Sequence, residues 1–156
     1  MTVALGDTMK DFESYCAYVD SIIVSSKPIH HKIKKQRINK MSGWISSNRA
    51  IPVPAATTRQ STGVQYKNAS FDFIENISVR ADGRGVDKIS YIYEFECWNS
   101  LTKLYFRYEK DPEHAEPNHP LHHLHVDTKE PRYPTAEVSL EQIIEFLCTQ
   151  LGCGQN

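Results

Sequence analysis

The sequence predicts an α+β fold in which an antiparallel β-meander packs against an N-terminal and a C-terminal helix. Three observations carry this prediction. Apolar residues recur at helical spacing early in the chain, hydrophobicity alternates with period two from Thr62 to Asp127, and a capped apolar stripe follows Ser139. With 156 residues, of which 40% are hydrophobic and 24% charged, the chain is expected to form one globular domain over residues 1–156.

The first element is expected to be a helix with Asp7 or Thr8 as its N-cap. Pro28 should end it, because the residue before a proline is disfavoured in the α region. The spacing of its apolar residues places them in one stripe along the helix. This stripe consists of Phe12, Tyr15, Cys16, Val19, Ile22 and Ile23.

The next segment, residues 29–40, is basic and has few apolar positions. It fits either a strand with one wet face or a continuation of the helix. Further on, Ile51-Pro-Val-Pro54 cannot be a central strand, because its two prolines lack the amide hydrogens that a sheet needs. We expect an edge strand or a loop there.

Three stretches then alternate in hydrophobicity: Phe71–Val79, Ile89–Trp98 and Leu101–Tyr108. Turn-forming residues separate them at positions 82–85 and 99–100. The stretches are rich in β-branched and aromatic residues, which predicts an antiparallel meander. One face of the second strand is expected to carry Ile89, Tyr91, Tyr93, Phe95 and Cys97.

The remaining elements are a loop, a short strand and a helix. Residues 109–120 are rich in Pro, Asp, Glu, Asn and His, which indicates a loop, and Leu121–Asp127 is expected to form a short strand. The helix over residues 139–151 begins with a capping box formed by Ser139 and Gln142. The chain thus divides into a basic segment (27–67), a meander with a histidine-rich loop (62–127) and this helix.

Composition excludes several classes of protein. No apolar run approaches the roughly 18–20 residues that span a bilayer, and no signal peptide is expected, since the first residues lack its basic and apolar regions. The four cysteines (Cys16, Cys97, Cys148 and Cys153) include no C-x-x-C pair, which argues against a disulfide framework or a cysteine-based zinc ribbon. We therefore expect a cytoplasmic protein.

The net charge of –1 hides a marked asymmetry along the chain. No acidic residue lies between Asp20 and Asp72, whereas that stretch holds nine basic residues. One interpretation is a solvated face that the acidic second half balances after folding, and the other is a phosphate-binding surface. For the second interpretation the candidate nucleic-acid-binding residues are Lys32, Lys34, Lys35, Arg37 and Lys40.

Histidine is concentrated in one place. Five of the seven histidines are His114, His119, His122, His123 and His125. In a strand over residues 121–127, His123 and His125 would share a face, because they stand two positions apart, and His122 would point the other way. An Arg107-Tyr108-Glu109 run lies one loop upstream.

Three interpretations of this cluster stay open. His123 and His125 could act as general acid and base, with Arg107 binding a phosphate, which suffices for RNA cleavage without a metal or any other cofactor. Alternatively, the His-x-His pair together with His114 or Glu109 could hold a divalent metal such as zinc. In the third interpretation the histidines only form hydrogen bonds within a polar loop. The candidate catalytic residues are Arg107, Tyr108, Glu109, His114, His123 and His125, and the candidate metal ligands are His114, His123 and His125.

Two runs, residues 104–114 and 120–126, resemble the signature of the TumE family of prokaryotic toxin–antitoxin proteins. In that family a strand ending in Arg-Tyr-Asp leads through a Pro-His loop to a Pro-x-His-x-His-Val-like segment. Residues 66–75 and 91–93 resemble the strands that precede it, so the resemblance covers residues 63–147. Position by position it includes Arg107, Tyr108, His114, His123 and His125, whereas Glu109 stands where the family has Asp.

The resemblance implies a small toxin that a helix-turn-helix-type antitoxin neutralises. Together with the basic segment and the histidine cluster, this leaves three hypotheses for function. The protein could be a toxin that acts on RNA as a ribonuclease, a non-catalytic nucleic-acid-binding accessory of a CRISPR-type defence system, or a histidine-rich metal-binding protein. The sequence leaves open whether the chain is an enzyme and whether it forms a homodimer.

Overall fold

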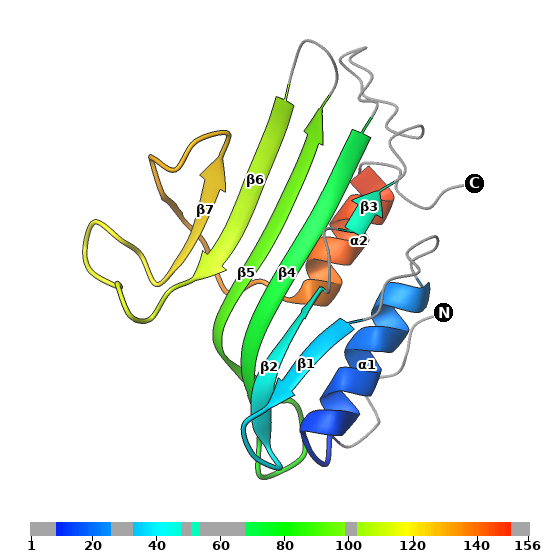
Figure 1. The fold of residues 1–156 in the computed structure, drawn as a ribbon. Helices are drawn as coiled ribbons and strands as arrows, with labels where there is room; N and C mark the ends of the chain where they lie inside the picture. Colours follow the sequence, from blue (N-terminus) through cyan, green and yellow to red (C-terminus); the bar gives the residue numbers. More distant parts are fainter. Residues whose placement is uncertain (1–8, 26–32, 48–50, 54–67, 99–102, 151–156) are drawn as a thin grey trace.

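The computed structural model describes residues 9–25, 33–47, 51–53, 68–98 and 103–150, and over these it confirms the predicted α+β fold (Figure 1). An eight-stranded antiparallel sheet has the strand order β1-β2-β4-β5-β6-β7-β8, and β3 pairs with β4 outside this path. The elements are α1 (Phe12–Ser25), β1 (Ile33–Arg37), β2 (Ser42–Ser47), β3 (Ile51–Val53), β4 (Asn68–Val79), β5 (Val86–Trp98), β6 (Lys103–Lys110), β7 (His122–Val126), β8 (Tyr133–Pro134) and α2 (Leu140–Gln150).

One face of the sheet forms the core. Alternate residues of β4 and β5, such as Phe71 and Tyr93, are fully buried there. Both helices contribute to the same buried cluster, α1 with Phe12 and Val19 and α2 with Ile143, and the helices contact each other. They therefore cover the same face, and the opposite face of the sheet carries no helix of the described chain (Figure 1).

The start of α1 differs from the predicted one. The helix begins at Phe12, and Asp11 caps it: its Oδ1 accepts the amide hydrogen of Ser14 at 3.0 Å, while the Ser14 hydroxyl oxygen accepts the amide hydrogen of Asp11 at 2.9 Å. The prediction of Asp7 or Thr8 as the cap was wrong, since an Asp-x-x-Ser pair next to the first turn satisfies these free amides. Both predicted residues lie outside the described chain.

The face predicted for β5 is right at four of its five positions. Ile89 is 45% exposed, whereas the side chain of Lys88 is buried. The register steps from Asn76↔Ser90 to Ile77↔Lys88, so a β-bulge leaves Ile89 without a partner. The bulge turns Lys88 into the core, where its ammonium donates to the Glu75 carboxylate at 2.7 Å.

The remaining elements settle the open alternatives for local structure. Residues 33–37 form a strand, β1, at one edge of the sheet, and β3 is a short strand paired with β4 alone among the described strands. The capping box of α2 is confirmed: Gln142 donates its amide hydrogen to the Ser139 hydroxyl at 3.1 Å, and Ser139 donates its amide hydrogen to the Gln142 side chain at 2.8 Å.

Candidate functional site

The pairing of β6 with β7 assembles the candidate site. The register aligns Glu109 with His123 and Arg107 with His125, so these four side chains lie on one face of the sheet. It is the face opposite the helices, because Phe106 lies on the other side of β6 and is buried in the core. His123 and His125 share a face, as the sequence predicted.

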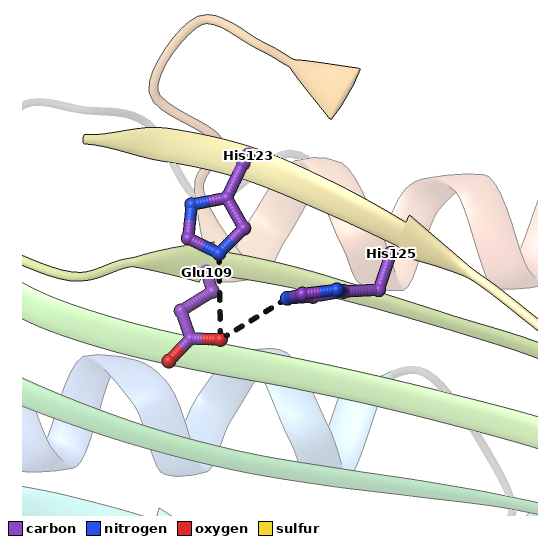
Figure 2. A group of neighbouring side chains, drawn as sticks. All are labelled: Glu109, His123 and His125. Atoms are coloured by element: carbon purple, nitrogen blue, oxygen red, sulfur yellow. Dashed lines mark ion pairs between the residues drawn. The ribbon is translucent and has the colours of Figure 1, made fainter. Parts of the chain in front are cut away.

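Figure 2 shows both imidazole rings directed at the carboxylate of Glu109. Its Oε2 lies 3.7 Å from Nε2 of His123, 3.5 Å from Nε2 of His125 and 3.0 Å from Nη2 of Arg107. The three ligand-type atoms of Glu109, His123 and His125 lie within 4.8 Å of one another.

The other ring nitrogen of each histidine faces a backbone carbonyl. Nδ1 of His123 donates to the Pro120 oxygen and Nδ1 of His125 to the Lys129 oxygen, both at 2.7 Å. A carbonyl oxygen only accepts, so the proton of each neutral ring is on Nδ1 and Nε2 carries a lone pair. Asp127, at a positive φ of 59°, turns the chain after β7 so that Lys129 returns beside His125.

Burial distinguishes the members of the site. His123 is fully buried and His125 is 6% exposed, whereas the side chain of Arg107 is 28% exposed. Burial lowers the pKa of His123, which favours its neutral form at pH 7. Its Nε2 has no hydrogen-bond partner among the described residues, although it is buried.

Two further histidines form an outer row. The ring of His119 packs edge-on against His123, with 4.8 Å between centroids, and the ring of His114 stacks on His119 with 6.0 Å between centroids. His114 is the most exposed, with 68% of its side chain accessible, and its Nδ1 is 2.9 Å from the Asp111 carboxylate. The structure therefore groups Glu109, not His114, with His123 and His125.

His119 is the neighbour that sequence reasoning missed. It reaches His123 because the loop before β7 closes on itself, with Glu116 and His119 exchanging backbone hydrogen bonds at 2.9 and 3.0 Å. The concentration of histidines hinted at this position, but its contact depends on loop geometry, which periodicity does not predict.

Tyr108 does not join the site. It pairs with Leu124 on the helix-covered face, where its ring meets Phe106 edge-on at 5.9 Å between centroids. A strand alternates its side chains between faces, so Tyr108 points away from its neighbours Arg107 and Glu109. Among the predicted catalytic residues, only Arg107, Glu109, His123 and His125 come together.

The basic residues of β1 are divided between the two faces of the sheet. Lys34 lies on the face of the candidate site, in one cross-strand row that runs through Ser46, Ile74, Ile92, Glu109 and His123. Lys35 lies on the other face, where it pairs with Glu13 of α1. Five strand spacings separate Lys34 from His123, which is about 24 Å. Lys32 lies outside the described residues.

Comparison with protein families shows which family the chain belongs to. A family model described as "Toxin TumE" matches residues 36–151. The chain belongs to the TumE toxin family. The matched residues include the whole of β6, β7 and α2, and hence the candidate site. No curated protein and no solved structure gave a match.

Membership in the TumE family makes the protein the toxin component of a toxin–antitoxin system, with a cognate antitoxin as its partner. No helix in the described part of the chain is long and apolar enough to cross a membrane. The family match covers the resemblance seen in the sequence and extends it at both ends.

Proposed function

We propose that this TumE-family toxin cleaves RNA at the site formed by Arg107, Glu109, His123 and His125. The observation that supports the proposal is the convergence of two imidazole Nε2 atoms on one carboxylate oxygen, with a guanidinium 3.0 Å away. Imidazole and carboxylate groups take up and deliver protons near neutral pH, and a guanidinium binds phosphate oxygens in pairs.

The proposed reaction uses the nucleophile that RNA itself contains. The 2′-hydroxyl attacks the adjacent phosphorus, the new P–O2′ bond forms and the P–O5′ bond breaks. One proton leaves the 2′-hydroxyl and one is delivered to the departing O5′. The products are a 2′,3′-cyclic phosphate and a 5′-hydroxyl, so the step needs no water or other co-reactant. The role of Arg107 is to neutralise charge that develops on the non-bridging oxygens.

A matched pair of substrates tests this proposal. The purified toxin is incubated with labelled single-stranded RNA and with an oligonucleotide of the same sequence that has 2′-deoxyribose throughout. We expect cleavage of the RNA alone, with a cyclic phosphate at the new end. Equal cleavage of both oligonucleotides would exclude attack by the 2′-hydroxyl. Binding of RNA without cleavage, by protein that still inhibits growth, would exclude RNA cleavage as the toxic activity.

Lys34 and Lys35 offer a test of where RNA binds, because the two neighbours lie on opposite faces of the sheet. If RNA crosses the face of the candidate site, Lys34→Ala should weaken binding and lower the slope of log affinity against log salt by about 0.7. Lys35→Ala should leave that slope unchanged, since Lys35 pairs with Glu13 on the helix face. Fluorescence anisotropy over a salt series measures both. Equal effects of the two substitutions would contradict binding on this face.

A further inference from the structure

We propose that Glu109, His123 and His125 hold a divalent transition-metal ion, with one carboxylate oxygen and the two Nε2 atoms as its ligands. Imidazole and carboxylate are the ligand types of zinc sites that keep an open coordination position, and they also suit Mn²⁺ and Co²⁺. The sequence left His114 and Glu109 open as partners of the His-x-His pair, with His114, His123 and His125 as the named candidates, and the proposed set has Glu109 in place of His114.

The hydrogen bonds behind the two rings support this proposal. A metal-binding histidine characteristically donates its second ring nitrogen to a carbonyl or carboxylate, which fixes the tautomer and aims the free lone pair at the ion. Both rings meet this condition, through Pro120 and Lys129, and both lone pairs point at Glu109. Arg107 in turn bonds the Glu109 carboxylate at 3.0 Å and fixes its orientation.

The two distances from the Glu109 carboxylate oxygen to the Nε2 atoms fit a shared metal better than direct hydrogen bonds. Ligands held at about 2.1 Å from a tetrahedral ion are about 3.4 Å apart, close to the 3.5 and 3.7 Å that separate the carboxylate oxygen from the two Nε2 atoms. A charge-assisted N–H···O bond would be about 2.7–2.9 Å long. Without a cation between them, the Nε2 lone pairs of His123 and His125 would face the negatively charged Glu109 carboxylate, which is unfavourable in a buried site.

The buried nitrogen of His123 is the most specific indication. Its Nε2 is inaccessible and has no hydrogen-bond partner among the described residues, a condition that costs free energy unless another group satisfies the atom. The ring is fully buried, so bulk solvent does not satisfy this nitrogen either. A metal ion accepts the lone pair without requiring a proton.

Three protein ligands leave at least one coordination position of such an ion open. The accessible side chain next to it is Arg107, and the pair of an open metal position and a guanidinium suits a phosphate oxygen. An ion bound there would polarise a phosphoryl group as a Lewis acid. Atoms that ligate the ion cannot also transfer protons, so with the ion bound this role replaces the acid–base role proposed above for Glu109, His123 and His125. Metal binding itself does not depend on RNA being the substrate, so the two proposals can fail separately.

The test uses the full chain, purified and stripped of metal with EDTA. Isothermal titration with Zn²⁺ and with Mn²⁺ measures the affinity and stoichiometry, and the visible absorption of bound Co²⁺ reports the coordination geometry. We expect one ion per chain for the wild type, and affinity reduced at least about tenfold by Glu109→Gln and by His123→Ala. His114→Ala should bind like the wild type. Circular dichroism without metal checks that each variant is folded, and Glu109→Gln keeps the size of the native side chain if His123→Ala fails to fold.

Two outcomes would overturn the proposal. In the first, the wild type binds Zn²⁺, Mn²⁺ and Co²⁺ no more tightly than Glu109→Gln does, and the three residues then form only an ion pair. In the second, His114→Ala loses the affinity that Glu109→Gln retains, so that the ligand set is the other trio of His114, His123 and His125. Metal binding by a wild type that does not cleave RNA would retain the metal site and reject the proposed function.

Discussion

His123→Ala is expected to abolish growth inhibition by the toxin and to lower RNA cleavage by at least about 100-fold, the usual contribution of a positioned acid, base or ligand. The variant removes an Nε2 that is buried, has no hydrogen-bond partner among the described residues and lies 3.7 Å from the Glu109 carboxylate. Colony counts after induction measure the toxicity, and single-turnover cleavage of labelled RNA measures the rate.

His122→Ala is the matched control for this loss. The two histidines are neighbours on β7, but His122 lies on the opposite face, where its Nδ1 meets the hydroxyl of Tyr91 at 3.1 Å. Removing it takes away one hydrogen bond outside the candidate site, so cleavage and toxicity should be retained. If His123→Ala folds, binds the antitoxin and still inhibits growth like the wild type, the assignment of the site is wrong.

The sequence predicted the part of the site that depends on a single strand. Alternation along residues 121–127 suffices to place His123 and His125 on one face, and it separates His122 from them. The partner from the next strand was harder to choose. Glu109 and His114 both precede β7, and only the register between β6 and β7 brings Glu109 opposite His123.

The alternation of hydrophobic residues in the sequence does not predict two features of the fold. The bulge at Ile89 reverses the alternation at the start of β5, and nothing in a strict period-two pattern marks that position. The basic stretch was predicted as one possible phosphate-binding surface, but strand β1 divides neighbouring lysines between two faces of the sheet. In both cases the direction of a side chain depends on pairing with a distant strand.

Lys88→Met is expected to destabilise the fold by about 3–5 kcal/mol, the usual effect of leaving one partner of a buried ion pair uncompensated. The side chain of Lys88 is only 8% exposed and that of Glu75 is inaccessible. The hydroxyls of Tyr15 and Tyr93 also donate to the Glu75 carboxylate, so α1 and two strands meet at this one charge. The pKa of each tyrosine is raised well above its usual value. Burial is the largest cause, and the negative charge of Glu75 is the second.

Urea unfolding followed by circular dichroism measures the loss, and an exposed ion pair provides the comparison. Arg80 and Asp87 lie 2.7 Å apart with 51% and 65% of their side chains accessible. Because water solvates those charges, Arg80→Met should change the midpoint little. The double variant Lys88→Met/Glu75→Gln should regain part of the stability that Lys88→Met loses, since no charge then stays buried alone. If Lys88→Met unfolds at the same urea concentration as Arg80→Met, the buried pair contributes little to stability, and the bulge that turns Lys88 inward must be explained by something other than the charge of Glu75.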